Sequence, residues 1–134
     1  METFRFELVS PECLLKDTAA GMVIVPGMDG DFGVLPGHSP MMSTIRPGLV
    51  EIHETESSEV ERLFVKGGLA QVTPTGLTIL AEEIIHLGDV DLADLADNII
   101  AARQDLDSAV DDVDKARATR ELGWMEALSQ VMSH

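Results

Sequence analysis

The sequence predicts a β + α protein, with an all-β sandwich or barrel in residues 1–88 and an antiparallel helical hairpin in residues 89–134. Before Gly88, glycine and proline separate short runs of β-branched and apolar residues, which is typical of sandwiches and barrels. After Asp91 there is no proline, and Gly123 is the only glycine. Apolar residues in this second part recur at three- and four-residue steps, as in amphipathic helices.

The N-terminal part contains several apolar runs bounded by turn-forming residues. The turn signals are Pro26-Gly27, Gly67-Gly68 and Pro74-Thr75-Gly76, whose prolines and glycines fix or free the backbone. We therefore expect β-strands at residues 4–9, 22–25, 48–53, 62–66, 69–73 and 76–81.

The first helical stripe runs from Leu92 to Leu106. Asp91, directly before it, is a suitable N-cap. The acidic segment 107–114 breaks the helical periodicity. We expect a short loop there, joining two helices that pack antiparallel.

The second helical stripe runs from Ala118 to Met132. Either Asp112 or Asp114 could cap this helix, because aspartate is a preferred N-cap residue. Gly123 costs the helix about 1 kcal/mol relative to alanine. It either permits a close approach of the helices or has no such role.

The chain is strongly acidic, with 24 Asp and Glu residues against 9 Lys and Arg and a formal net charge of -15 at pH 7. Such a charge repels nucleic-acid phosphates and anionic lipid, so we expect no nucleic-acid partner and a basic or polar partner surface. No apolar run approaches the roughly 20 residues that span a bilayer. The N-terminus lacks the apolar region of a signal peptide, so we expect no direct membrane insertion.

Cys13 is the only cysteine. A single cysteine forms neither an internal disulfide nor a thiolate zinc cage, so a reducing compartment is expected. The neighbours Leu14 and Leu15 favour a buried structural cysteine over a reactive thiol.

The segment from Pro26 to Pro40 is unusually rich in glycine and proline. Glycine frees the backbone and proline fixes it. We therefore expect this loop to have a defined backbone shape that is important for function. The segment lacks the Lys-Ser or Lys-Thr of a phosphate-binding loop. Asp29 and Asp31 lack the later ligands of a calcium loop, and His38 lacks nearby His or Cys partners for a metal. We therefore expect no cofactor and no metal.

Residues 30–40, which read Gly-Asp-Phe-Gly-Val-Leu-Pro-Gly-His-Ser-Pro, resemble the loop signature of the ATP synthase epsilon subunit family. Residues 47–50 (Pro-Gly-Leu-Val), 67–72 (Gly-Gly-Leu-Ala-Gln-Val) and 77–82 (Leu-Thr-Ile-Leu-Ala-Glu) are similar to later segments of that family. The two helical stripes follow in the family's order. The resemblance therefore covers essentially the whole chain.

This resemblance implies a flattened N-terminal β-sandwich followed by a two-helix hairpin. It implies a non-catalytic rotor subunit that lies beside the gamma subunit and on the c-ring and couples proton translocation to ATP synthesis. The resemblance also allows a contact of the C-terminal helices with the alpha/beta catalytic head, with a regulatory role that we expect to be weak. The expected location is the cytoplasmic face of a bacterial inner membrane, as a peripheral protein.

The resemblance also assigns contact roles to individual residues. The predicted c-ring contacts are Asp29, Asp31 and Phe32. The predicted gamma contacts are Ser10, His38, Met41 and Ser43. An ordinary turn residue is the alternative for Asp31 and His38, and Met41 with Met42 fits a core as well as an interface.

The start of the first helix departs from those family members that bind ATP through an aliphatic-Asp-x-x-Arg-Ala element. Here residues 90–95 read Val-Asp-Leu-Ala-Asp-Leu, so Asp91 is retained and Asp94 occupies the arginine position. An acid at that position repels a triphosphate. We therefore predict no nucleotide site.

Two other classes of function remain open from the sequence. One is a small acidic hydrolase that uses Asp29, Asp31 and His38. The other is an adaptor with a helical docking arm. Co-purification with gamma and the c-ring would distinguish a rotor subunit from both.

Overall fold

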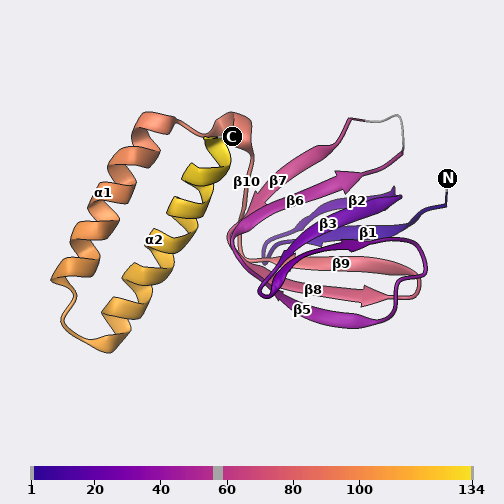
Figure 1. Cartoon of the computed structure of the whole chain (residues 1–134), viewed down its shortest axis with the longest axis horizontal. Helices are drawn as coiled ribbons and strands as arrows, with labels where there is room; N and C mark the ends of the chain where they lie inside the picture. The colour runs from indigo at the N-terminus through magenta and orange to yellow at the C-terminus, as the bar shows by residue number, and fades with distance from the viewer. Residues whose placement is uncertain (1, 56–58, 134) are drawn as a thin grey trace. The chain divides into compact units, whose positions relative to one another are not determined.

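A computed structural model describes residues 2–55 and 59–133 (Figure 1). The chain divides into two compact units, Met1–Ile85 and His86–His134. The first unit is a β-sandwich and the second contains two α-helices, which confirms the predicted fold class. The change of composition after residue 88 falls within a short 3-10 helix, η1 (Leu87–Asp89).

The first unit is a 10-stranded sheet folded into a sandwich (Figure 1). Its strands are β1 (Phe4–Val9), β2 (Leu14–Ala20), β3 (Met22–Gly27), β4 (Gly30–Val34), β5 (Met41–Ile45), β6 (Gly48–His53), β7 (Glu61–Val65), β8 (Gly68–Thr73), β9 (Gly76–Ala81) and β10 (Ile84–Ile85). The hydrogen-bonded order is β10-β7-β6-β3-β5-β8-β9-β1-β2, and β4 pairs with β3. Strands β1 and β9 run parallel, which places the start of the chain beside the last long strand.

The expected strands are present, and four further strands appear that the sequence pattern did not predict. Strands β1, β6 and β9 have the predicted bounds, and β3, β7 and β8 match within two residues. The unpredicted strands are β2, β4, β5 and β10. The expectation of a loop throughout residues 26–40 is wrong in part, because residues 30–34 pair with β3 despite their two glycines.

The core of the sandwich follows from alternation along the strands. In β1 the side chains of Phe4, Phe6 and Leu8 are buried while those between them face outward. Strand β9 repeats the pattern with Leu77 and Ile79. These side chains join one continuous apolar cluster with residues from the other long strands. Full burial of a side chain such as Phe6 contributes about 1.5–3 kcal/mol relative to exposure.

The Gly67-Gly68 pair forms the corner between β7 and β8. Gly68 has a φ of 149°, which side chains other than glycine rarely adopt. A Cβ atom at Gly68 would lie 2.1 Å from the carbonyl oxygen of Leu80. The glycine is therefore required by both the backbone conformation and the close approach of β9.

Lys16 of β2 forms ion pairs with two glutamates from the β6–β7 region. Its Nζ atom lies 3.3 Å from Glu54 Oε1 and also pairs with Glu61. Partial burial lowers the pKa of Lys16, but the hydrogen bonds and charges of Glu61 and Glu54 outweigh it and raise the pKa overall. Lys16 therefore stays charged and joins β2 to the strands on the other layer.

The expectation that Cys13 is buried is wrong, because the cysteine is exposed. Leu14 and Leu15, on which that expectation rested, are themselves 53% and 48% exposed. Cys13 directly precedes β2 and the two leucines begin it, and in the described part of the chain β2 is the last strand of the sheet order. Apolar neighbours in sequence did not indicate burial at this edge.

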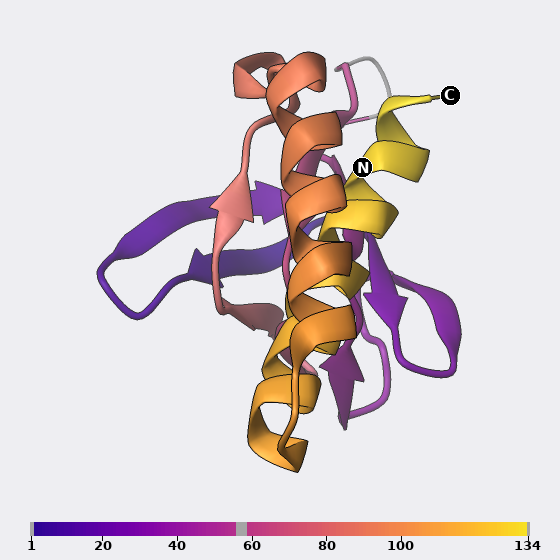
Figure 2. The same cartoon turned by 90° about the vertical axis from the view of Figure 1, so that its left-hand side faces the viewer.

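The second unit consists of α1 (Leu92–Ser108) and α2 (Asp112–Met132). The two helices run side by side and are joined by a short connection at one end (Figure 2), as expected. Asp91 is the predicted N-cap of α1, and its carboxylate accepts from the amides of Ala93 and Asp94.

The N-cap of α2 is Asp111 rather than Asp112 or Asp114. Its Oδ1 atom accepts from the Asp114 amide at 2.8 Å, which satisfies one of the free N–H groups of the first turn. Asp112 already lies within the helix. Asp111, Asp112 and Asp114 are all able to act as an N-cap, so the sequence alone did not indicate which of them begins the helix.

The helical hairpin buries few side chains. The buried residues are Leu95, Ile99 and Ala102 in α1, and Ala118 and Leu128 in α2. A Cβ atom at Gly123 would meet no atom within 4 Å, so this glycine does not permit a close approach of the helices.

No helix in the described part of the chain is long and apolar enough to cross a membrane.

Candidate functional site

The tip of the β3–β4 hairpin is exposed and carries Asp29, one of the predicted contact residues. Met28 and Asp29 form a two-residue loop between the paired residues Gly27 and Gly30. Met28 and Asp29 have ordinary negative φ values, whereas Gly30 has a φ of 135°, so the glycine absorbs the unusual geometry. Met28 is 59% exposed, and Asp29 is also exposed.

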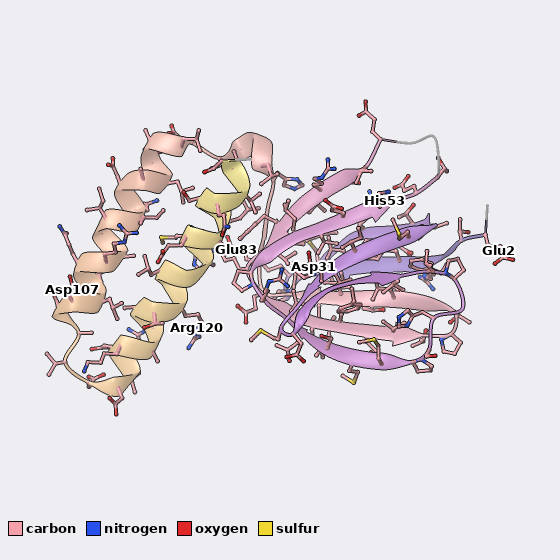
Figure 3. The ribbon with its side chains drawn as sticks, in the orientation of Figure 1. Glu2, Asp31, His53, Glu83, Asp107 and Arg120 are labelled. Atoms are coloured by element: carbon pink, nitrogen blue, oxygen red, sulfur yellow. The ribbon has the colours of Figure 1, made fainter. Side chains whose placement is uncertain are left out.

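Asp31 lies on β4, just beyond this tip, and is labelled in Figure 3. Its carboxylate accepts a hydrogen bond from Arg46 at 2.5 Å, and the Asp31 side chain remains 60% exposed. The other guanidinium nitrogen of Arg46 donates to the Gly27 carbonyl oxygen at 2.6 Å. Asp31 is therefore accessible, but its charge is paired within the chain.

Phe32 is half-buried and packs against the apolar core of the sandwich. A Cβ atom at Gly27 would come within 3.0 Å of its ring. The structure thus brings the three predicted c-ring contacts together on one hairpin, but in different surroundings. Asp29 is open to solvent, Asp31 is paired, and Phe32 anchors the hairpin.

His38 occupies a tight turn that follows β4. Its backbone amide donates to the Leu35 carbonyl oxygen at 3.1 Å, and Gly37 has a φ of 79°, as a type II turn with Pro36 at its second position requires. The Nδ1 atom of His38 lies 2.7 Å from the Ser39 carbonyl oxygen. Because a carbonyl only accepts, Nδ1 carries the proton.

Strand β5 carries Met41 and Ser43 with Ile45 on the face that points toward the core. Met42 lies on the opposite face and is 63% exposed, whereas Met41 is 37% exposed. The sequence prediction named Met41 as the contact residue. The alternation with the buried Ile45 is the signal that indicates Met42 as the more accessible methionine.

Ser10 directly follows β1, which is not a neighbour of β5 in the sheet. Its hydroxyl donates to the Cys13 carbonyl oxygen at 3.4 Å. Strands β9 and β8 separate β1 from β5, which corresponds to three strand spacings, or about 14 Å. Ser10 and Ser43 are therefore too far apart to form one compact site.

An apolar row crosses the outer face between these two positions, and the sequence prediction missed it. Leu69, Leu80, Val9 and Leu14 occupy successive paired positions on β8, β9, β1 and β2. Leu80 is 45% exposed, which is unusual for a residue of a central strand. A hollow of about 350 Å³ lies beside the middle of this row, lined by Val9, Ser10, Pro11, Leu80, Ala81 and Glu82.

The first turn of α1 holds the residues that the nucleotide prediction considered. The Asp91 carboxylate caps the helix at 2.9 and 3.1 Å from two backbone amides. Asp94 is exposed in the same turn. Two carboxylates at the N-terminus of this helix interact favourably with the helix dipole. The same two charges repel an anionic ligand.

The residues described here contain no group of three or more His, Cys, Asp or Glu side chains placed to hold a metal ion. The hydrolase alternative requires His38 to act with Asp29 or Asp31. In the hydrogen bonds found, the imidazole of His38 contacts a backbone carbonyl, and Asp31 contacts Arg46. No observation therefore favours that alternative.

Comparisons with known proteins agree with this architecture. The family described as ATP synthase, Delta/Epsilon chain, beta-sandwich domain, matches residues 3–87. The ATP synthase epsilon chain of Parvibaculum lavamentivorans is 43% identical over 95% of this chain and 96% of its own length. That of Maricaulis maris is 42% identical over 99% of this chain and 98% of its own. A chain in the Euglena gracilis mitochondrial ATP synthase structure (OSCP, F1 and c-ring) matches with a TM-score of 0.85 at 22% identity, covering 97% of this chain and 81% of that one, a likeness of fold.

Proposed function

Because the chain belongs to the ATP synthase epsilon-chain family, we propose that it is a non-catalytic central-stalk subunit. In this role it links gamma to the c-ring and couples proton translocation to ATP synthesis. The observation that carries the proposal is an exposed, acid-bearing hairpin tip held in place by a packed sandwich. A rotor must transmit torque through surfaces of fixed shape, and close-packed interiors transmit strain.

The c-ring contact is assigned to the β3–β4 tip. Asp29 and the Asp31–Arg46 pair offer hydrogen-bonding groups at the surface. Phe32 supports this contact from behind, because its ring packs on the core. The β3–β4 hairpin needs no cofactor to contact the c-ring in this way.

The gamma contact is assigned to both sides of β5, together with the outer face of β8, β9 and β1. Ser10 follows β1, and His38 precedes β5, so these two residues border that face. Met41 and Ser43 belong to β5, where Met42 adds exposed apolar area. The apolar row supplies a surface that gains from removal from water.

The helical hairpin is assigned a weak regulatory role. Residues 89–134 contain 11 Asp and Glu against 4 Lys and Arg. The basic side chains that would draw the hairpin toward an acidic surface of the alpha/beta head are therefore outnumbered. Helix α2 has 21 residues, a length of about 31 Å. The hairpin binds no nucleotide in this proposal, because Asp94 replaces the arginine.

The proposed location is the cytoplasmic face of a bacterial inner membrane, as a peripheral subunit. Attachment is through the c-ring and gamma rather than through lipid, because the net charge of -15 is repelled by an anionic leaflet. No nucleic-acid partner is proposed, for the same reason.

Co-purification from detergent-solubilised membranes tests the proposal. A tagged full-length chain is expected to bring down gamma and the c-ring in constant ratio, and the purified chain alone is expected to hydrolyse neither ATP nor a simple ester. Recovery of the chain without either subunit would contradict the rotor assignment. Turnover by the pure protein that disappears in His38→Ala would instead support the hydrolase.

A further inference from the structure

Arg46 joins both strands of the β3–β4 hairpin from the corner between β5 and β6. Its backbone amide donates to the Pro26 carbonyl oxygen at 2.9 Å. Its side chain donates to the Gly27 carbonyl oxygen at 2.6 Å and to Asp31 Oδ1 at 2.5 Å. One residue therefore fixes the end of β3 and the start of β4 at the same time.

Arginine suits this double contact because its planar guanidinium presents several donors in a fixed geometry. The corner behind it is tightly packed, since a Cβ atom at Gly48 would lie 2.9 Å from the Pro26 Cβ. The side chains of Arg46 and Asp31 remain 40% and 60% exposed. Surface pairs of this kind add little to global stability, so the main effect of Arg46 is on the position of the tip.

We propose that Arg46 is a positioning residue, and that the c-ring recognises Asp31 and Arg46 together through uncharged hydrogen-bonding groups rather than through a cation. This inference rests on the proposed function. A cation that approached Asp31 would also meet the Arg46 guanidinium, and the attraction to one would be largely cancelled by repulsion from the other. Amide or hydroxyl groups can hydrogen-bond to both partners without this cost.

Asp29 has a different role at the same tip. Its exposed carboxylate makes no ion pair in the described part of the chain. Any dependence of binding on salt is therefore expected to come from Asp29, because salt screens an unpaired exposed charge. The Asp31–Arg46 pair provides a fixed hydrogen-bonding pattern that depends little on salt.

Hydrogen exchange of the isolated full-length chain tests the positioning role directly. Arg46→Gln is expected to raise amide exchange in residues 28–34 about threefold to tenfold, as loss of one or two net hydrogen bonds predicts. The matched control is Arg62→Gln, which breaks another exposed pair on the sandwich, with Glu51 at 3.1 Å. Unchanged exchange at the tip in Arg46→Gln, or an equal change in the control, would overturn the positioning role.

Binding to ATP synthase membranes stripped of this subunit tests the partner chemistry. Asp31→Asn and Arg46→Gln are each expected to weaken binding about tenfold, because each leaves one charge unpaired. The double variant keeps an amide pair and is expected to bind within about threefold of the original chain, as coupled residues allow. Tighter binding of Arg46→Gln at low salt, with Asp31→Asn and the double variant equally weak, would overturn the proposal in favour of a cation.

The two experiments separate the inference from the function on which it rests. If the unaltered chain failed to bind the stripped membranes, the proposed function and the partner chemistry would both be overturned. Hydrogen exchange in the isolated chain would still decide whether Arg46 positions the hairpin.

Discussion

The sandwich and the helical hairpin differ in how far their own packing determines their shape. The sandwich has a continuous apolar cluster with residues from each of the strands β1 to β9. The helical hairpin buries only a few side chains in each helix, such as Ala118 and Leu128 in α2. This difference indicates that surfaces of fixed geometry belong on the sandwich, whereas the hairpin is the region where a change in conformation costs little.

Charge distinguishes the two regions in the same direction. In the sandwich, basic residues pair closely with acids, as Arg62 does with Glu51 at 3.1 Å and Lys66 with Glu83 at 2.8 Å. The ion pairs found in the hairpin are longer, 3.8 Å for Arg103 with Glu126. Both regions carry an excess of acids, so the difference lies in the closeness of the ion pairs, and long exposed pairs add little to stability.

Loss of a core side chain is expected to have the largest effect on stability. Phe6 is fully buried, so Phe6→Ala should lower the free energy of unfolding by about 3–5 kcal/mol. Urea denaturation, monitored by far-UV circular dichroism, measures this change in the free energy of unfolding. Leu92→Ala on the hairpin is the control, because Leu92 is 58% exposed and its loss should cost under about 0.5 kcal/mol. Equal losses in the two variants would remove the contrast between the regions.

Substitution of a glycine is expected to act with opposite sign in the two regions. In the sandwich, Gly68→Ala should lower the free energy of unfolding by at least about 2 kcal/mol, from positive-φ strain together with the clash on Leu80. Gly33→Ala is the matched control, because a Cβ there meets nothing within 4 Å. A Gly68→Ala protein as stable as the control would show that the β7–β8 corner tolerates rearrangement.

In the hairpin, Gly123→Ala should stabilise α2 by about 0.5–1 kcal/mol, because alanine restricts the unfolded chain and nothing crowds the new methyl group. Helical ellipticity during thermal unfolding measures the change, and Trp124 fluorescence follows the same helix. Destabilisation by this variant would mean that the hairpin is packed more closely at Gly123 than the structure indicates.

The sequence allowed prediction where the pattern was local. Strand β6 shows strict alternation and α1 has a regular stripe after a capping aspartate, so both were predicted with accurate starts. Strand β2 was missed because its mixed polarity reflects an edge position that depends on the fold. Strand β4 was missed because Gly30 and Gly33 suggested a loop.

The candidate site divides in the same way. The exposure of Asp31 followed from its position among turn residues, but its pairing with Arg46, 15 residues along the chain, did not. That contact depends on the register of β3 against β5, in which Gly27 lies opposite Ile45. The apolar row through Leu80 likewise depends on the pairing of β1 with β9. Neither relation is visible in a local pattern.

The smallest effect is expected from removing the helical hairpin altogether, a change that separates coupling by the sandwich from regulation by the helices. Membranes from cells that lack the subunit would be supplied with either the full chain or a chain without residues 89–134. We predict that both restore ATP-driven proton pumping, and that ATP hydrolysis differs between them by less than about twofold, or about 0.4 kcal/mol in activation free energy. Loss of pumping with the shortened chain, or a rise in hydrolysis of about tenfold or more, would contradict the assignment of coupling to the sandwich and of only weak regulation to the hairpin.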